Sequence, residues 1–450
     1  MSAHNDERRE AGADEQEQGS SKKPKRSRRW AFLTLALPIA LLAWSCAPKA
    51  PLPVTPTSKL VIGDAVIAVQ LGEAQSQSGL ESPIQDNLVA LVDVHGEQDI
   101  VRIGNQWEGR ILWSDRGISF GAEQWEYQTT ENGTSSQETE GWRASNVQRY
   151  ELSDGRFIVV SYGMDLGYRV DAIELDGSVT SVSTPGTRGD MGQCGDRILS
   201  IVDTEQLSRM KSEAFEAYAA QSAGDGEQPE VLSVVIQLND RDGDTPRILG
   251  VAPMLDGLVS GQREFACEGD TITIPSVQTG DSRAARVKAD GSEEGPMVLE
   301  RWDLSTGHRT IIPVLDEQGN PIEVNSERSI FHYRGVQVGN EYRFISEGGD
   351  AFSVDLTSGR GRYLFSHAME KSARMLFQVS ETGVYALEDR REDHNVTLSY
   401  RPWDGGAYRD VITMDKLADY VWLEGDILSS GHWRRIQSFS LRPGWDGGAQ

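Results

Sequence analysis

Three carboxylates lie close together in the short stretch Asp240-Arg241-Asp242-Gly243-Asp244. Carboxylate oxygens on a turn are the hard ligands that Ca2+ prefers, so Asp240, Asp242 and Asp244 form a weak candidate calcium site. The stretch lacks the complete spacing of a calcium-binding loop and its distal glutamate. Because Asp and Gly are strong turn formers, a solvated hairpin turn explains the same residues. We therefore expect a turn here and no bound metal.

A second candidate is Ser119, in the centre of Gly117-Ile118-Ser119-Phe120-Gly121. This G-x-S-x-G spacing resembles the nucleophile turn of serine hydrolases, which joins a strand to a helix above a parallel sheet. No helical pattern follows Gly121, and β-forming residues surround the motif. We therefore expect Ser119 to lie within a β-sheet and to have no nucleophilic role.

The histidines and cysteines indicate no metal enzyme. The seven histidines are scattered, with no H-E-x-x-H or other paired ligand spacing, and the three cysteines fit no zinc motif. Cys194 and Cys267 each stand just before a Gly-Asp pair, so a disulfide between them is one prediction for an oxidising compartment. Because the two offsets differ by one residue, free thiols remain the alternative. Gly-rich nucleotide motifs are absent, and we expect no cofactor.

The N-terminus has the pattern of an export signal. Residues 1–29 are polar, end in a basic cluster and are predicted to be disordered. Residues 30–46 form an apolar run that is short for a membrane span but suits a signal peptide. Its end, Ala43-Trp44-Ser45-Cys46, resembles a bacterial lipoprotein signal. That resemblance implies cleavage before Cys46 and lipidation of its thiol.

Two alternatives remain for this leader. The segment Ser27-Arg28-Arg29 with its apolar flank resembles a twin-arginine export signal. An uncleaved signal anchor is also consistent with the apolar run, with its basic side in the cytoplasm. In each case the chain past about residue 50 faces away from the cytoplasm, so we expect a membrane-anchored protein of the cell envelope. The proline-rich residues 47–58 are predicted to be a stiff spacer.

Past the spacer, residues 59–450 repeat one pattern: a strand, a turn centred on Gly-Asp or a near equivalent, and a strongly apolar strand. The clearest turns begin at four glycines: Gly63, Gly195, Gly269 and Gly425. Each is followed by a second hairpin, of which Arg301 to Ile312 is the best example, with Ser305-Thr306-Gly307 as its turn. Two hairpins per unit predict a four-stranded blade.

Eight such units, of about 48 residues each, predict an all-β fold: a β-propeller of eight four-stranded blades, with seven as the alternative. Trp302-Asp303-Leu304 with Thr306-Gly307, and Ser153-Asp154-Gly155-Arg156 before an apolar strand, resemble PQQ-like, TolB-like and WD40-like repeats. The chain lacks the vicinal cysteine pair that is a hallmark of PQQ enzymes. Since the last unit has only three strands, closure of the ring is the least specified part of the fold.

The turns divide the expected ring into two unlike faces. First-to-second and third-to-fourth turns are short, whereas the other connections carry the long insertions: 70–87, 203–230, 276–296 and 316–328. Binding residues gather on loops held by a rigid scaffold, so we expect a partner on the insertion-bearing face. One helix is predicted near 204–222, capped by Asp203. Its Phe215 and Tyr218 are candidates for partner binding, or they pack on the rim of the ring.

The chain is acidic, with a net charge of −25. Such a surface repels nucleic acids and anionic lipids, and we expect no nucleic-acid partner. Without a convincing catalytic set, the sequence favours a non-catalytic binding or scaffolding module for a protein or polymer partner. The alternative is an extracellular hydrolase or lyase with its site in the mouth of the propeller.

Overall fold

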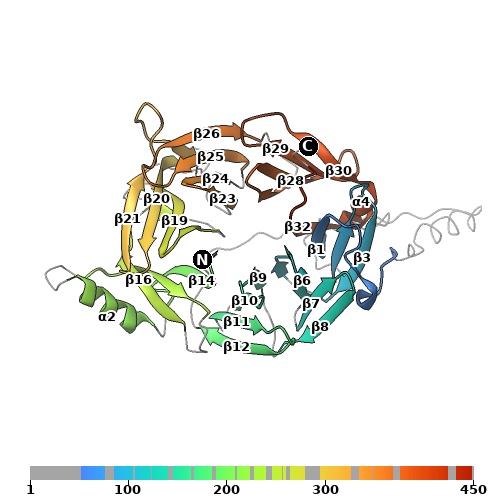
Figure 1. The fold of residues 1–450 in the computed structure, drawn as a ribbon, viewed down its shortest axis with the longest axis horizontal. Coiled ribbons are helices and arrows are strands. Elements are labelled where there is room, and N and C mark those ends of the chain that lie inside the picture. Colours follow the sequence, from blue (N-terminus) through green and yellow to red (C-terminus); the bar gives the residue numbers. More distant parts are fainter. Residues whose placement is uncertain are drawn as a thin grey trace, which may run out of the picture. The chain divides into compact units, whose positions relative to one another are not determined.

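The computed structural model describes 17 stretches of the chain: residues 52–76, 86–104, 107–122, 124–139, 145–163, 167–184, 189–207, 210–222, 228–239, 246–255, 257–259, 264–278, 294–325, 334–346, 348–367, 375–423 and 432–447. They belong to one compact unit, which spans Pro51–Gly425 and Ser429–Gln450. Within this unit, seven largely antiparallel sheets stand side by side around a ring, as Figure 1 shows. Each sheet is one blade, and the predicted β-propeller is confirmed.

We number the blades in chain order and give their strands from the ring centre outward. Blade 1 holds β32 (His432–Leu441), β1 (Ile67–Ser76), β2 (Asn87–Val92) and β3 (Gln98–Ile103), with the short β31 (Trp422–Leu423) beside β32. Blade 2 holds β5 (Leu112–Ser114), β6 (Gly117–Ala122), β7 (Trp125–Thr130) and β8 (Gly133–Glu138). Blade 3 holds β9 (Ser145–Glu151), β10 (Phe157–Gly163), β11 (Gly167–Ile173) and β12 (Val179–Thr184), with β4 (Trp107–Gly109) parallel to β9.

The remaining four blades complete the ring. Blade 4 holds β13 (Asp190–Cys194), β14 (Arg197–Asp203), β15 (Leu232–Gln237) and β16 (Arg247–Pro253). Blade 5 holds β18 (Ala266–Glu268), β19 (Thr271–Gln278), β20 (Glu294–Asp303) and β21 (His308–Pro313), with the short additions β17 (Leu258–Val259) and β22 (Glu323–Asn325). Blade 6 holds β23 (Arg334–Val338), β24 (Glu341–Ile345), β25 (Asp350–Asp355) and β26 (Gly361–Ser366). Blade 7 holds β27 (Met375–Val379), β28 (Gly383–Arg390), β29 (Asn395–Pro402) and β30 (Arg409–Met414).

The ring has seven blades, so the alternative count is confirmed and the preferred count of eight is wrong. The first and last units are parts of one blade: β32, from the C-terminal end, pairs antiparallel with β1 from Ile67↔Leu441 onward. The first unit has a Gly63-Asp64 turn but no innermost strand of its own, and β32 supplies it. A strand count along the chain scores these two parts as two units.

Turns led by glycine join the first two strands of blades 4, 5 and 6. Gly195, Gly269 and Gly339 have φ of 60°, 59° and 60° there, and the residues that follow them, Asp196, Asp270 and Asn340, have negative φ. Glycine first and a residue of negative φ second is the pattern of a type II′ hairpin turn. The turns also join neighbouring blades, because the Asp196 carboxylate accepts the Ser153 N–H at 2.7 Å.

The predicted inserted helix exists but is shorter than expected. Helix α2 spans Lys211–Gln221, and Asp203 does not cap it: the Asp203 carboxylate accepts the Gln206 N–H at 2.9 Å in a turn that precedes the helix. Figure 1 shows α2 outside blade 4, beside β16. A second helix, α4 (Asp415–Val421), and the single 3-10 turn η1 (Thr57–Lys59) were not expected from the sequence.

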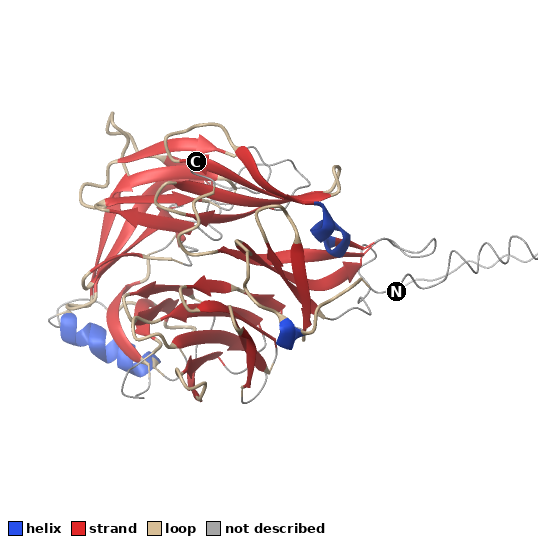
Figure 2. Ribbon diagram, turned by 45° about the vertical axis from the view of Figure 1, so that its right-hand side comes forward, coloured by secondary structure: helices blue, strands red, loops and turns tan. Residues whose placement is uncertain are grey.

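The described part of the proline-rich segment packs on the propeller. The Thr55 N–H donates to the Ile100 carbonyl at 2.7 Å, and Thr55 bridges Val101 in parallel along the outer edge of β3. The Tyr420 hydroxyl of α4 donates to the Pro53 carbonyl at 2.5 Å. Residues 52–57 therefore cover the outer edge of blade 1. Figure 2 shows that the strands, in red, make up most of the fold and that the helices, in blue, lie at its periphery.

Candidate functional site

Apolar side chains fill six of the seven interfaces between neighbouring blades. The six clusters of buried hydrophobic residues join blades 7 and 1, 1 and 2, 3 and 4, 4 and 5, 5 and 6, and 6 and 7. The interface between blades 2 and 3 has no such cluster among its described side chains. We call this interface the polar seam. Because burial of apolar surface stabilises a propeller ring, an interface without an apolar cluster needs another explanation.

A buried ion pair lies in the polar seam. Arg149 of β9 is 0% exposed and Glu126 of β7 is 4% exposed, and the guanidinium donates to both carboxylate oxygens at 2.5 and 2.9 Å. The Ser119 hydroxyl donates to Glu126 at 2.8 Å, and Arg149 donates a further bond to the Arg110 carbonyl at 2.7 Å. Desolvating two charges offsets much of their attraction, so a buried pair is weak evidence for a purely stabilising role.

The backbone next to this pair leaves no room for a side chain. A Cβ on Gly121 would lie 2.4 Å from Nη2 of Arg149 and 2.5 Å from Oε2 of Glu126. A Cβ on Gly155, whose φ is +86°, would lie 1.6 Å from Cζ of Arg116. Two glycines therefore allow three charged side chains to pack in or beside the seam.

Blade 3 presents further charged groups on the same side. Asp171 of β11 is fully buried and accepts hydrogen bonds from Arg169 at 2.7 Å and from the Ser181 hydroxyl at 2.6 Å. On blade 2, burial and the Glu126 charge raise the pKa of Tyr127 above its ordinary value, so its hydroxyl stays protonated at neutral pH. The seam thus holds charged groups that are paired with one another.

A groove of about 330 Å3 opens along the seam. The hairpin of β7 and β8 lines one side of it, with Ser135, Ser136 and Gln137 from β8, and the β11–β12 turn lines the other side with residues 174–177. Its walls offer hydroxyl, amide and carboxylate groups, and Leu175, 69% exposed, adds an apolar surface at its mouth. This volume falls within the range of small-ligand sites.

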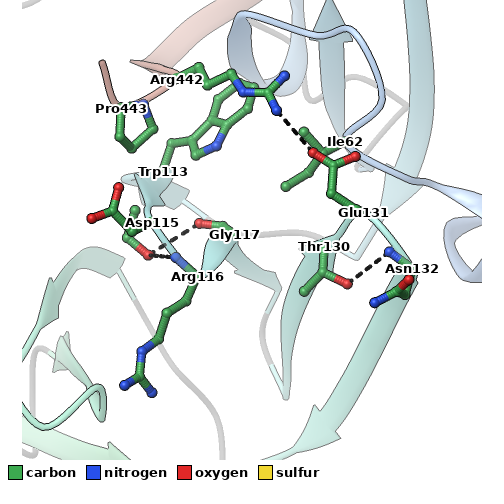
Figure 3. Close-up of a pocket in the computed structure, with 11 residues that line it drawn as sticks. Ile62, Trp113, Asp115, Arg116, Gly117, Thr130, Glu131, Asn132, Arg442 and Pro443 are labelled. Atoms are coloured by element: carbon green, nitrogen blue, oxygen red, sulfur yellow. Dashed lines mark hydrogen bonds and ion pairs between the residues drawn. The ribbon is translucent and has the colours of Figure 1, made fainter. Parts of the chain in front are cut away.

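A second cavity of about 270 Å3 adjoins the groove, with Arg116 lining both. Figure 3 shows Arg442 and Glu131 facing each other across its mouth, at 3.0 Å, while the Arg116 side chain points away from them. Arg116 extends toward blade 3, where it donates to the Gly155 carbonyl at 3.0 Å. Its guanidinium also lies 3.5 Å from the Glu151 carboxylate, which offsets part of its positive charge.

The polar seam can bind, but its residues form no catalytic set. Ser119, the serine of the G-x-S-x-G stretch, is 2% exposed and donates to a carboxylate that Arg149 already holds. A serine nucleophile needs an accessible hydroxyl and a free base within reach, and Ser119 lacks the first of these. In the part of the chain that the structure describes, no group of three or more metal-ligating side chains comes together.

The centre of the ring is crossed by an ion pair. Arg110, before β5, donates to Glu264, before β18, at 2.7 Å, which joins blades that are not neighbours.

In blade 5, burial raises the pKa of Glu300 although Arg309 and the Trp302 indole donate to it. Glu300 is 2% exposed, so its raised pKa reflects packing inside the blade and not access to a substrate.

The structure joins Cys194 and Cys267 in a disulfide, with their Cα atoms 5.5 Å apart. Arg197 lies beside it and donates to the Gly269 carbonyl and to the Asp270 carboxylate, both at 2.8 Å. Blades 4 and 5 are thus linked covalently and by an ion pair at their inner turns.

The other sequence candidates have separate positions. Phe215 and Tyr218 of α2 are partly buried and pack against the apolar cluster of blades 3 and 4. Cys46 and the aspartates Asp240, Asp242 and Asp244 lie outside the described residues. So do most residues of the insertion 276–296. The structure therefore does not bring the sequence candidates together in one site.

Sequence reasoning did not identify the polar seam. Ser119 stands out in the sequence only for its G-x-S-x-G spacing, which has no catalytic role here. Glu126, Arg149 and Gln137 belong to no recognisable sequence pattern. The available signal was composition: the outermost strand β8 reads Gly-Thr-Ser-Ser-Gln-Glu, whereas the inner strand β6 of the same blade is buried throughout. A blade whose outer strand has no large apolar residue cannot build a standard apolar interface with it.

The fold and the seam define the class of this chain: a seven-bladed β-propeller with one polar blade interface. No family model matches the chain, and no curated protein does. Its similar solved structures include BamB from Moraxella catarrhalis, at 10% identity and a TM-score of 0.34 over 67% of this chain and 87% of that chain. They also include an ACO/RPE65 chimera, at 10% identity and a TM-score of 0.41 over 85% of this chain and 94% of that chain. A third is the computationally designed Ika8 protein, at 13% identity and a TM-score of 0.35 over 74% of this chain and 98% of that chain. Likenesses this distant carry no argument about function.

Among the helices of the described residues, none combines the length and the apolar character that a bilayer crossing requires.

Proposed function

We propose that the protein is a non-catalytic binding module, which binds a partner in the groove of the polar seam. The observation that carries this proposal is the contrast between the blade interfaces. Six contain apolar clusters, whereas the seventh contains a buried ion pair and opens into a groove of about 330 Å3. Polar groups held in fixed positions on a rigid scaffold are the usual means of orienting a ligand.

We further propose that the module is anchored at the cell envelope through a lipid on Cys46. The support is the leader sequence, with its basic cluster, apolar run and terminal Ser45-Cys46. The bond between Cys194 and Cys267 agrees with this location, because disulfides persist in oxidising compartments. Mass spectrometry of the mature N-terminus tests the anchor. A lipid-modified Cys46 at the first position supports it, and an unmodified Cys46 inside an intact leader refutes it.

Site-specific crosslinking in intact cells tests the binding site. A photo-reactive amino acid replaces Leu175, which is 69% exposed and lines the groove. Tyr363 on blade 6, 52% exposed, is the matched control. We expect a discrete adduct from position 175 and none from position 363. Equal labelling at both positions, or no adduct at 175, would remove the polar seam as the binding site.

A further inference from the structure

The outer edges of the blades are not equally covered. Residues 52–57 run along β3 of blade 1, helix α2 packs against β16 of blade 4, and Leu315 bridges Arg360 in parallel at the edge of blade 6. Among the described residues, β8 of blade 2 pairs only with β7, so its outer edge has no strand beside it. An open strand edge is a template for pairing with another segment.

The ladder between β7 and β8 shows which backbone groups point outward. The Thr139 N–H donates to the Gln124 carbonyl at 2.8 Å, which makes these two residues a hydrogen-bonded pair. In an antiparallel ladder such pairs alternate, so Ser135 and Gln137 point their backbone groups toward β7. The N–H and carbonyl groups of Ser136 and Glu138 therefore point away from the sheet.

One end of this edge is closed and the rest is open. The Thr134 hydroxyl donates to the Leu60 carbonyl at 2.8 Å, because the chain that enters blade 1 crosses the start of β8. Ser135, Ser136 and Gln137 all line the groove. The groove also reaches Ser119, Glu126 and Gln128 on β6 and β7, so it covers part of the face of blade 2 and the open edge of β8 forms one border of it.

Carboxylates outnumber basic groups among the residues that line the groove. Glu174 and Asp176 line its far wall, and Glu126 lies deeper. Arg149 pairs with Glu126 and Arg156 lies 3.5 Å from Glu174, so Asp176 is the carboxylate of the groove that forms no ion pair with a described residue. Hydrogen bonds from Ser178 hold the pKa of Asp176 below its ordinary value, so its carboxylate is ionised at neutral pH. Arg116, the basic residue among those that line it, is engaged by the Gly155 carbonyl and lies 3.5 Å from Glu151. Complementary charge on a partner is therefore positive.

We propose that the polar seam binds an extended, basic peptide segment of a partner protein, which pairs with β8 as a fifth strand of blade 2. This inference rests on the proposed binding function and specifies its ligand. Strand addition uses the outward groups of Ser136 and Glu138, while a Lys or Arg of the peptide reaches Glu174 and Asp176. A second copy of this chain is a poor occupant, because each copy has a net charge of −25.

The test compares two substitutions at Ser136 in the full-length chain. Ser136→Pro removes the outward N–H without breaking the β7–β8 ladder, and edge strands tolerate proline. Ser136→Ala keeps the N–H and is the matched control. The probe is a library of random 12-residue peptides selected on the wild-type chain, followed by affinity measurement of the enriched peptides. A glycan array is the second probe.

We expect enriched peptides to be rich in Lys, Arg and β-forming residues. They should bind Ser136→Pro roughly tenfold more weakly, as for a lost hydrogen bond with a steric block, and Ser136→Ala unchanged. Asp176→Asn should weaken binding and its salt dependence. Circular dichroism and thermal melting confirm that Ser136→Pro is folded.

Three results would overturn the proposal. They are equal binding of peptides to Ser136→Pro, enrichment of acidic or sequence-independent peptides only, and tight binding of glycans in place of peptides. Each leaves the groove as a binding site, because crosslinking at Leu175 tests that claim separately. Loss of the crosslink at Leu175 would remove both proposals together.

Discussion

Replacing Arg149 by methionine tests whether the polar seam depends on its buried ion pair. The guanidinium is 0% exposed and supplies two of the hydrogen bonds to Glu126, which is itself 4% exposed. Without it, the buried Glu126 carboxylate loses the two hydrogen bonds and the opposite charge that Arg149 supplies. Loss of one partner of a buried pair costs about 3–5 kcal/mol, so we expect Arg149→Met to lower the free energy of unfolding by that amount.

The double variant separates the energetic coupling between the two charges from the other effects of each substitution. Glu126→Gln with Arg149→Met removes both charges and keeps similar volumes, so we expect it to lie within about 1.5 kcal/mol of wild type. The cycle also needs the single variant Glu126→Gln, and if that change is itself destabilising or neutral, the coupling between the two sites is at least about 1.5–3.5 kcal/mol. Urea denaturation followed by tryptophan fluorescence gives each free energy, with comparable m-values as the condition for comparing them.

An exposed ion pair provides the control. Lys416 and Glu97 are 62% and 64% exposed and also joined, and Lys416→Met should change the free energy of unfolding by less than about 1 kcal/mol. The reasoning fails if Arg149→Met costs under about 1 kcal/mol, or if the double variant costs the sum of its two single changes. Either result would mean that the two charges do not stabilise each other in the folded chain.

Three further predictions concern other contacts. The double change Cys194→Ala with Cys267→Ala removes a crosslink between positions 73 residues apart. It should lower the free energy of unfolding, measured by urea denaturation, by up to about 4 kcal/mol. Two free thiols in the denatured, non-reduced wild type would contradict the disulfide. Gly155→Ala places a Cβ 1.6 Å from Cζ of Arg116, at a backbone φ of +86°. It should lower the free energy of unfolding by about 1–3 kcal/mol in the same assay. An unchanged urea midpoint would show that Arg116 moves aside freely. Hydrogen bonds from its turn lower the pKa of Asp355 below 3.8, so its stabilising contribution is present above about pH 4 and is lost as the pH falls through the folded-state pKa. Asp355→Asn should therefore flatten the fall of the denaturation midpoint between pH 5 and about pH 2, and an identical fall in both proteins would refute this.

Local sequence specified the blades but not how the ring closes. Alternating apolar strands and Gly-Asp turns are local signals, and they located hairpins such as Arg301 to Ile312 correctly, as β20 and β21. Closure depends on pairing between β1 and β32, at opposite ends of the chain. No periodic signal joins two strands so far apart, and a count along the chain therefore gave one blade too many.

The binding site was harder to predict for a different physical reason. Whether a strand side chain faces solvent, its own blade or the next blade depends on the register and tilt of the blades, which sequence period alone does not give. Glu126 and Arg149 are 23 positions apart and come from different blades. The sequence showed two ordinary charged residues on strands, and only the ring brings them within 2.5 Å of each other.

The apolar burial at the other six interfaces explains how the ring can contain one polar seam. A propeller of seven blades has seven interfaces, and six apolar clusters supply most of the burial that holds this ring together. One interface can then contain polar groups without loss of the fold, provided that each charge is paired. The paired charges keep blades 2 and 3 in register, while the polar walls stay available above them as the groove. Filling the seam with well-packed apolar side chains should therefore leave the ring as stable or make it more stable, while it removes the binding surface.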